Sequence, residues 1–258
     1  MTVLPAVFVS HGAPDLSLHP SPARTFLSQL GKLSKPQAIL MISAHWGSDR
    51  PTIGKAEQPD TMHDFWGFDR RLYSIDYPAR GAPQLAEKVV QLLEDAGISS
   101  SSTPSRGLDH GTWNPLMLMY PSANIPVTQL SIQPRLTPSY HLQIGKILAP
   151  LRQEGILILA SGSATHNLRD FGKYPLDAPP PAWVENFSQW LSTALQQKDE
   201  SALLNYRQLA PYAKKNHPSE EHLLPMFVAL GATESTNIVE LHSSYTYGVL
   251  SMASYAFY

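Results

Sequence analysis

Cysteine is absent from the 258 residues of this chain. Its absence excludes a disulfide framework, a thiolate metal site and a cysteine nucleophile. It also agrees with a reducing compartment, so we expect a cytoplasmic protein. Any metal site must therefore be built mainly from histidine, aspartate and glutamate side chains.

A strong net charge and long apolar runs are also missing. The 19 basic and 21 acidic residues give a formal charge of −2. No basic run of five or more residues occurs, which argues against binding to a nucleic acid backbone. No apolar run approaches the ~20 residues of a membrane span, and residues 1–10 lack the basic start of a signal peptide. We therefore expect neither a nucleic acid partner nor membrane association.

Apolar residues are abundant, at 43% of the chain. A chain of this length buries roughly 70–75% of the surface that its unfolded form exposes. We find no charge block, no glycine- or serine-rich linker and no repeat of fixed period. The sequence therefore predicts one domain over residues 1–258.

Short apolar runs alternate with segments of helical periodicity. The runs typical of strands occupy residues 6–10, 38–43, 125–132, 155–161, 237–241 and 249–257. The helical patterns occupy residues 82–96, 140–151, 182–195 and 219–230. Ser219 is the candidate N-cap of the last helix, although His222 stands where a capping box has glutamate or glutamine. This alternation predicts an α/β domain with a mostly parallel or mixed central sheet flanked by helices.

Three of the ten histidines come shortly after predicted strands. They are His11, His45 and His166. Open α/β sheets bind ligands outside the carboxyl ends of their strands, and imidazole is the commonest metal ligand. Three histidines in this position point to one shared metal site. The alternative is that each is a loop or capping residue. The sequence contains no compact His-Glu-x-x-His motif, which would have favoured the metal site over this alternative.

His110 and His222 are two further candidates. His110 lies beside Asp109, which could orient an imidazole or cap a helix that starts near Trp113. His222 follows two glutamates, the second of which is Glu221. Acids in the first turn of a helix usually interact with the helix dipole, but this cluster could also supply one metal ligand.

The other five histidines have weaker claims to a functional role. They are His19, His63, His141, His217 and His242. We expect His141 in the first turn of a helix, and His63 in an aromatic-rich loop that could form the wall of a pocket. A buried, hydrogen-bonded role is expected for His242. The C-terminal residues 245–258 are interpreted either as the lining of a polar pocket or as an edge strand.

Five short motifs contain the candidate histidines. They are Ser-His-Gly-Ala-Pro at 10–14, Ser-Ala-His-Trp at 43–46, Asp-His-Gly-Thr-Trp at 109–113, Ser-Gly-Ser-Ala-Thr-His-Asn-Leu at 161–168 and Glu-His-Leu-Leu-Pro at 221–225. Together they resemble the motifs of the class III extradiol ring-cleavage dioxygenases. The closest subgroup is the 4,5-DOPA extradiol dioxygenase type, and the resemblance spans nearly the whole chain in order.

The resemblance implies a single α/β domain that binds one divalent metal ion per chain. His11, His45 and His222 match the metal ligands of this subgroup, and Glu221 is the fallback for the third position. A relative that cleaves protocatechuate has glutamate there, which gives the arrangement of two histidines and one carboxylate. Iron(II) is the metal expected for activity, and zinc is possible as the bound ion.

The same resemblance implies roles for His166 and His110 as the pair of catalytic histidines. We expect His166 to take a proton from a catechol and later to deliver it to the reacting oxygen, and it could also approach the metal. We expect His110 to hydrogen bond the developing charge. The implied reaction opens the ring of a catechol, DOPA-like or related, with O2 to give a semialdehyde. No residue is assigned to substrate binding.

Two alternatives remain open at this stage. One is a non-enzymatic, metal-binding relative of the same fold. The other is a zinc-dependent hydrolase that uses metal-bound water, with Glu221 as the possible base. The presence of both His110 and His166 favours an enzyme, because metal binding alone requires neither.

Overall fold

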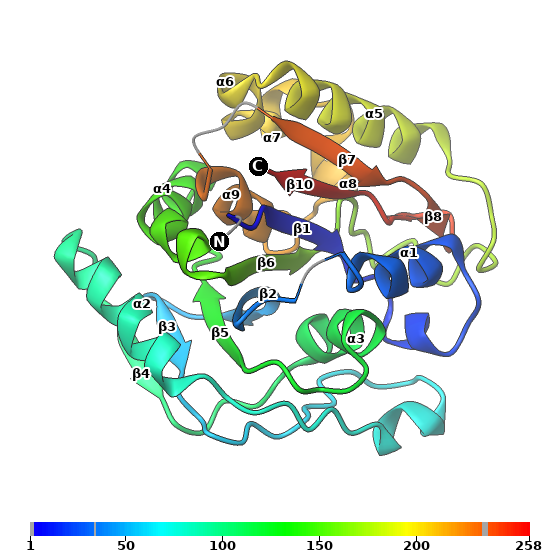
Figure 1. Ribbon diagram of the computed structural model, residues 1–258. Coiled ribbons are helices and arrows are strands. Elements are labelled where there is room, and N and C mark those ends of the chain that lie inside the picture. Colours follow the sequence, from blue (N-terminus) through cyan, green and yellow to red (C-terminus); the bar gives the residue numbers. More distant parts are fainter. Residues whose placement is uncertain (1–2, 34, 234–236) are drawn as a thin grey trace.

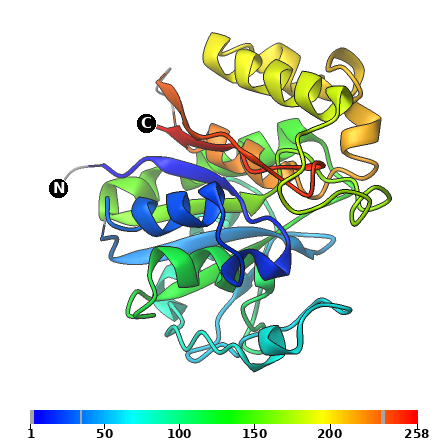
Figure 2. The same cartoon turned by 90° about the vertical axis from the view of Figure 1, so that its right-hand side faces the viewer.

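A single large sheet with helices on both faces forms the frame of the protein (Figures 1 and 2). The computed structural model describes residues 3–33, 35–233 and 237–258. The sheet has the strand order β4-β3-β5-β2-β6-β1-β10-β7, and β8 and β9 form a separate pair. The strands are β1 (Ala6–Ser10), β2 (Ala38–Gly47), β3 (Thr52–Gly54), β4 (Ser101–Thr103), β5 (Val127–Ile132), β6 (Ile156–Gly162), β7 (Ile238–His242), β8 (Tyr245–Thr246), β9 (Leu250–Ser251) and β10 (Ser254–Phe257).

The helices lie between these strands in the chain. The α-helices are α1 (Pro22–Leu30), α2 (Pro83–Asp95), α3 (His110–Met119), α4 (Pro138–Leu148), α5 (Ala182–Gln197), α6 (Glu200–Leu204), α7 (Tyr206–Leu209), α8 (Ala213–Asn216) and α9 (Leu224–Gly231). The 3-10 helices are η1 (Pro14–Ser17), η2 (Arg70–Ser74) and η3 (Ala149–Glu154). None of the helices in the described ranges is both long and apolar enough to cross a membrane.

The direction of the strands confirms the predicted mixed sheet. The four central strands β1, β6, β2 and β5 are parallel to one another. Outside this block, β3 pairs antiparallel with β5, and β10 pairs antiparallel with both β1 and β7. The first and last strands of the chain therefore lie side by side.

Alternate residues of the central strands face two separate apolar layers. Phe8, Leu40 and Ile158 pack with α2, α4, α5 and α9 on one face. Val9 and Met41 pack with α1 and α3 on the other face. Because both faces are covered, these strands are apolar without a break, which is the pattern that made them recognisable in the sequence.

Two predicted elements differ from the structure. The helix predicted over residues 219–230 begins only at Leu224, so Ser219 is not its N-cap. Pro225 explains the difference. Proline has no N–H to donate to the residue four positions earlier, so it is tolerated in the first turn of a helix but not in the interior of one that starts at residue 219. The strand predicted over residues 249–257 is divided into β9 and β10, which belong to different sheets.

The C-terminal strand does not lie at an edge of the sheet, which was one of the two interpretations of residues 245–258. The last strand, β10, lies between β1 and β7 and is therefore internal, so the edge-strand interpretation of residues 245–258 is wrong. The edges are β4 and β7. Leu250 from the same segment lines the main pocket described below.

Candidate metal centre

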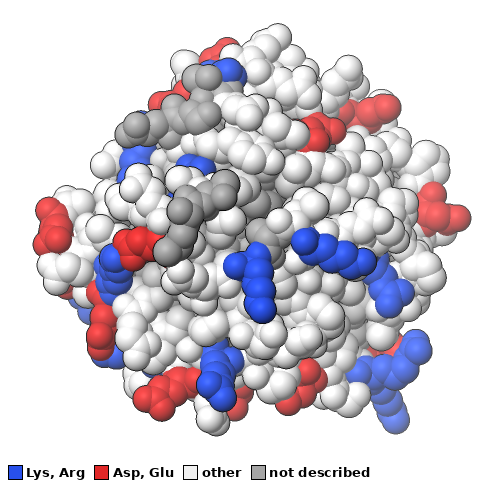
Figure 3. All heavy atoms as spheres, in the orientation of Figure 1, with Lys and Arg blue, Asp and Glu red and all other residues white. Residues whose placement is uncertain are grey.

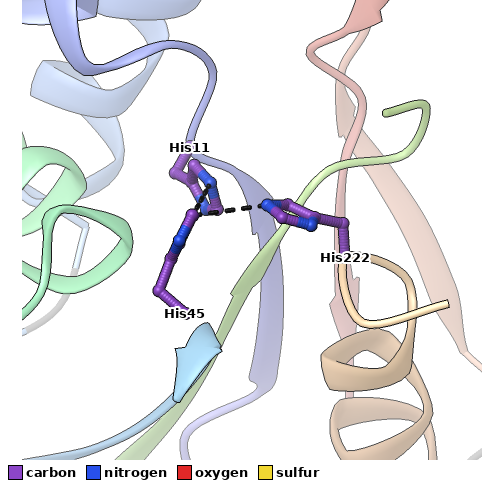
Figure 4. A group of neighbouring side chains, drawn as sticks. All are labelled: His11, His45 and His222. Atoms are coloured by element: carbon purple, nitrogen blue, oxygen red, sulfur yellow. Dashed lines mark hydrogen bonds between the residues drawn. The ribbon is translucent and has the colours of Figure 1, made fainter. Parts of the chain in front are cut away.

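Three histidines from distant parts of the chain meet at the carboxyl ends of the parallel strands (Figure 4). His11 directly follows β1. His45 lies inside β2, which runs past the predicted end to Gly47, and the pairing of β2 with β5 is irregular just before this point. Such an irregularity changes the direction of side chains at a strand end. His222 approaches from the turn that precedes α9.

Glycine at the end of β6 permits the approach of His222. A Cβ atom added to Gly162 would lie 2.1 Å from the carbonyl oxygen of His222. The N–H of the next residue, Ser163, donates a hydrogen bond of 2.9 Å to the same carbonyl. The turn that carries His222 is thus fixed against the strand by a contact that any larger residue would prevent.

The Nε2 atoms of the three histidines converge. The Nε2 atom of His45 lies 3.2 Å from that of His11 and 3.3 Å from that of His222. Two nitrogens that bind one ion at about 2.1 Å, with an angle of about 90–110° between them, lie roughly 3.0–3.4 Å apart. The donor set therefore fits a divalent ion such as iron or zinc, for which imidazole is a suitable ligand.

The opposite ring nitrogen of each histidine has an oxygen partner. The Nδ1 atom of His11 lies 2.9 Å from Ser161 Oγ, and that of His222 lies 3.2 Å from Glu221 Oε1. The Nδ1 atom of His45 lies 3.5 Å from Asp64 Oδ2. Acceptors at Nδ1 favour the tautomer with its lone pair on Nε2, which is the form that binds a metal.

A proline in α3 contributes to this orientation of His11. Pro115 has no N–H, so the carbonyl of Gly111 one turn earlier lacks its helical donor. The Ser161 hydroxyl donates to that carbonyl instead. Because its hydrogen is used in this way, Ser161 Oγ presents its lone pairs to His11 and accepts a hydrogen bond from Nδ1.

The three rings are held in their neutral form. Burial, reinforced by the neighbouring histidines, places the pKa of both His11 and His222 well below the ordinary value. Burial, with the nearby His110, lowers the pKa of His45 to about 4. Since only a neutral imidazole has a free lone pair, the cluster is able to bind a metal ion without first losing protons at neutral pH.

The two predicted catalytic histidines border the same cluster. The ring of His166 stacks on that of His222 with 3.4 Å between centroids, and the ring of His110 lies 4.0 Å from that of His45. Burial, with a smaller effect of the nearby His217, lowers the pKa of His166 to about 3. Its ring nitrogens have no hydrogen-bond partner within the part of the chain that the structure describes. All five site residues named from the sequence thus lie together.

Asp64 is a site residue that the sequence analysis missed. Its Oδ1 atom accepts hydrogen bonds from both the backbone N–H and the Nδ1 of His110, each at 2.9 Å. Burial raises the pKa of the Asp64 carboxyl, but the hydrogen bonds from His110 outweigh burial and hold it well below its usual range. Asp64 therefore stays ionised and links His110 to His45. Its position in the Met-His-Asp-Phe-Trp loop gave no signal of this contact.

Asp109 has the capping role that was one of its two interpretations. Its Oδ1 atom accepts the N–H of Thr112 at 3.1 Å, and α3 begins at His110 and not near Trp113. The carboxylate is fully buried and is also bonded to Arg106 at 2.8 Å. The alternative, in which Asp109 orients an imidazole, is not what the structure shows, since Asp64 orients His110.

The weaker histidine candidates lie outside the cluster. His141 is the fourth residue of α4, at the end of its first turn as predicted, with Nδ1 2.9 Å from the carbonyl oxygen of Thr137. His63 does not line the pocket, although its aromatic neighbours do, and its Nε2 lies 3.0 Å from the carbonyl oxygen of Ile75. His242 is half-buried, with Nε2 2.7 Å from Ser244 Oγ.

The histidines form the floor of a cavity of about 530 Å³. Its walls come from the loop with Phe65 and Phe68 and from the segment after β6 with Leu168 and Phe171. A pocket of this size suits a small molecule with one aromatic ring. The arrangement therefore combines a floor of histidines that fits a metal ion, two further histidines beside it and apolar walls.

Two buried histidines that are not among the five site residues give a prediction for stability. Burial lowers the pKa of His141 and of His217 to about 4, whereas an unfolded histidine titrates near ~6.5. Between these values the unfolded chain binds more protons, so the free energy of unfolding falls as pH drops from ~6.5 towards 4. Each histidine contributes up to ~3 kcal/mol to this loss. Urea unfolding of the chelator-treated protein at several pH values measures it, and a stability that rises in this window would contradict the assignment.

The family comparison agrees with this chemistry. Residues 18–258 match the model of a family described as the catalytic LigB subunit of aromatic ring-opening dioxygenase. The match contains His45, His110, His166 and His222, whereas His11 lies just before it.

Named relatives and a solved structure extend the similarity to nearly the whole chain. A "4,5-DOPA dioxygenase extradiol" of Beta vulgaris is 43% identical, over 97% of this chain and 95% of that protein. A protein of the same name from Escherichia coli K12 is 36% identical, over 98% and 94% respectively. The crystal structure of an uncharacterized Escherichia coli K12 protein has a TM-score of 0.82 at 32% identity, and covers 99% of this chain and 100% of that one. The chain therefore belongs to the LigB family of class III extradiol dioxygenases and is an aromatic ring-opening enzyme.

Proposed function

We propose that this enzyme opens the ring of a catechol, DOPA-like or related, in a metal-dependent reaction with O2. His11, His45 and His222 are the proposed ligands of one divalent ion per chain, with iron(II) as the active ion and zinc possible as bound. The observation that carries the proposal is the convergence of three Nε2 atoms beside His110 and His166 on the floor of the pocket. The proposed catalytic domain spans residues 1–258, because β1 and β10 from the two ends of the chain share one sheet.

The proposed reaction needs no further reductant. The ring bond next to the diol breaks, and both atoms of O2 enter the product, one as an aldehyde oxygen and one in a carboxylate. The catechol supplies the electrons that reduce O2. Iron(II) at the three histidines would hold both reactants and pass electron density between them, which zinc, without redox chemistry, does not.

His166 is the proposed general acid and base. Burial lowers its pKa, so the ring is unprotonated at neutral pH and has a lone pair available for the proton of a catechol hydroxyl. The ring lines the pocket and stacks on the ligand His222, so an accepted proton stays next to the reacting atoms. The same nitrogen then returns the proton to the reacting oxygen atom that came from O2.

His110 is the proposed donor for the developing negative charge. Its Nδ1 is committed to Asp64, which leaves Nε2 as the nitrogen that faces a substrate. Nε2 is therefore the ring nitrogen that is placed to hydrogen bond a charge that develops in the pocket. A donor that is fixed before the reaction begins stabilises charge without a cost of reorganisation.

The proposed partners are a small catechol and O2. On the face drawn in Figure 3, basic and acidic side chains are interspersed over the surface. This distribution supports the prediction that nucleic acid is not a partner. The cytoplasmic location stays a prediction from the absence of cysteine.

Asp64→Asn tests the positioning role of that carboxylate. Removing its charge weakens the link between His110 and His45, and we expect metal affinity or kcat to fall by roughly 10–100-fold. Chelator competition measures the first quantity and product absorbance the second. Asp60→Asn is the matched control, since Asp60 is exposed and lies outside the pocket. Equal values for the two variants would show that Asp64 does not position the site.

The overall proposal is tested by O2 uptake with two preparations of the same protein. One is loaded with iron(II) and the other with zinc, and each is given a panel of catechols. We expect O2 consumption and a yellow semialdehyde with iron alone, and no reaction without air. Product formation with zinc under anaerobic conditions would favour the hydrolase instead.

A further inference from the structure

The backbone that carries His45 leaves the regular ladder of the sheet. Along the pairing of β2 with β5, residues 43–46 of β2 occupy the stretch of a single β5 residue, Ser131. The pairing of β2 with β6 ends at Ser43. Within the described sheet, residues 44–46 therefore have no register partner in either neighbouring strand. The position of His45 depends on contacts of another kind.

Two side chains hold the backbone of His45 in place of strand partners. Its N–H donates a hydrogen bond to Ser43 Oγ at 3.2 Å. Its carbonyl accepts a hydrogen bond from Arg106 Nη2 at 3.3 Å. The Arg106 guanidinium also lies over the ring of Trp46, 5.0 Å from its centroid. Both polar backbone groups of His45 are thus bound by side chains, one of which comes from a distant part of the chain.

The carboxylate of Asp109 connects these two contacts. Its Oδ1 atom accepts the Ser43 hydroxyl at 2.7 Å, and its Oδ2 atom accepts Arg106 Nη2 at 2.8 Å. Because Ser43 gives its hydrogen to the carboxylate, its lone pairs face the N–H of His45. Arg106 uses the same nitrogen for Asp109 and for the carbonyl of His45. A change at Asp109 therefore reaches both backbone groups of His45.

The same carboxylate fixes the start of the helix that carries His110. Asp109 Oδ1 accepts the N–H of Thr112 at 3.1 Å and so caps α3, whose first residue is His110. The first turn of α3 packs directly on the metal centre, because a Cβ atom added to Gly111 would lie 2.9 Å from Cδ2 of His45. Asp109 thus holds His45 and His110 against each other.

The pair formed by Arg106 and Asp109 is buried. Asp109 has no exposed surface and Arg106 exposes 17% of its side chain. Gln129 Nε2 donates a further hydrogen bond of 2.9 Å to Asp109 Oδ2, so the carboxylate has a full set of donors. Taking two charges out of water is costly, and buried ion pairs add little net stability compared with apolar residues of similar volume. The contacts to His45 point to a different use for the pair, which is to fix position.

We propose that Arg106 and Asp109 are positioning residues of the metal centre, which hold the backbone of His45 in the place that metal binding requires. The proposal rests on the proposed function, because it takes His45 as a ligand. Neither residue belongs to the described lining of the cavity, so both act through His45. His45 needs such support most, since its Nδ1 partner lies at 3.5 Å, whereas those of His11 and His222 lie at 2.9 and 3.2 Å.

Arg106→Met tests this role, because methionine keeps an unbranched stem but has neither the charge nor the hydrogen bonds. We expect affinity for zinc, measured by chelator competition, to fall by roughly 10–100-fold. We also expect the visible absorption spectrum of the cobalt(II)-loaded protein to change, because its bands depend on the arrangement of the ligands. Arg106→Lys keeps a cation beside Asp109 and is expected to recover part of the affinity.

Arg152→Met is the matched control. Arg152 is also a buried arginine that binds backbone carbonyls, those of Leu4 at 2.6 Å and Ala232 at 2.8 Å, but it lies outside the cavity lining. We expect this variant to lower the free energy of unfolding of the metal-free protein. We expect it to leave the zinc affinity and the cobalt spectrum unchanged. The control therefore separates the loss of position from the loss of stability.

Two milder variants keep the test informative if Arg106→Met does not fold. Ser43→Ala removes the hydroxyl between Asp109 and His45 without changing a charge, and is expected to lower zinc affinity by roughly tenfold. Asp109→Asn removes the ion pair, while asparagine remains a good cap for α3. If Asp109 and Arg106 act together, the double variant Asp109→Asn, Arg106→Met loses about as much affinity as the weaker-binding single variant. Fully additive losses would contradict a joint role.

The outcomes separate this inference from the function on which it rests. Wild-type zinc affinity and an unchanged cobalt spectrum in Arg106→Met, or in Ser43→Ala where that variant stands in, would overturn the positioning role and leave the metal site in place. Equal changes in Arg152→Met and Arg106→Met would also overturn it. If His45→Ala binds zinc as tightly as the unmodified protein, the proposed ligand set is wrong and the positioning role falls with it.

Discussion

His166→Gln is expected to lower kcat by roughly 10²–10⁴-fold while the protein keeps one metal ion per chain. The reason is that glutamine has a similar size but cannot exchange a proton near neutral pH. His166 is not among the three histidines whose Nε2 atoms converge, so the metal site stays intact. Stopped-flow absorbance of the product and metal analysis of the same sample measure the two quantities.

His19→Gln is the control for this experiment, because His19 is half-buried and lies outside the cavity. We expect its kcat to match that of the unmodified enzyme. Full turnover in His166→Gln would show that another group moves the proton. Loss of metal from His166→Gln would instead make His166 a ligand, since its ring stacks on that of His222.

The second large effect is expected for His222→Ala, which removes one of the three converging nitrogens. Metal sites with four ligands bind with roughly 10–16 kcal/mol, so the loss of one ligand costs roughly 3 kcal/mol, or a factor of at least about 100 in affinity. We expect the isolated variant to be nearly free of iron and to show no ring opening. Metal content and chelator competition measure the effect.

Glu221→Gln distinguishes the two candidates for the third ligand. Glu221 Oε1 accepts from His222 Nδ1 at 3.2 Å, and glutamine keeps an acceptor oxygen, so metal affinity is expected to fall by only roughly tenfold. If Glu221→Gln loses the metal and His222→Ala keeps it, then the glutamate is the ligand. The group formed by His166, Glu221 and His222 is the geometry in which that result would arise.

The buried strands and the surface helices of this fold could be predicted from the sequence. The runs at β1, β2 and β6 are apolar without a break because both faces of the sheet are covered. The helices α2 and α5 have one apolar face each, which gives a clear helical period. In these elements, local pattern and tertiary environment agree.

Elements without a distinct periodic pattern could not be predicted in this way. The helix α3 is buried on nearly all sides and contains Pro115, so it shows neither an apolar face nor an uninterrupted helical composition. The strands β3 and β4 have three residues each, and Ser and Thr form most of them. Their positions depend on pairing with distant segments, which a local pattern does not contain.

The residues of the candidate site likewise divide into those that the sequence could predict and those that it could not. His11 and His45 could be grouped because both stand near the ends of buried strands, and the motif resemblance added His222. Asp64 could not be identified, because only the folded loop brings it within 2.9 Å of His110. Likewise, Ser161 contacts His11 across 150 positions of sequence, and no spacing rule predicts such a contact.

The most direct test of ring opening follows the oxygen atoms. The iron-loaded enzyme is given a catechol under 18O2, the product is reduced at once to prevent exchange of its aldehyde oxygen with water, and its mass is measured. We expect a product that contains both heavy oxygen atoms, with O2 and catechol consumed in equal amounts. A product with label only from heavy water, or an unchanged catechol beside consumed O2, would contradict extradiol cleavage at this site.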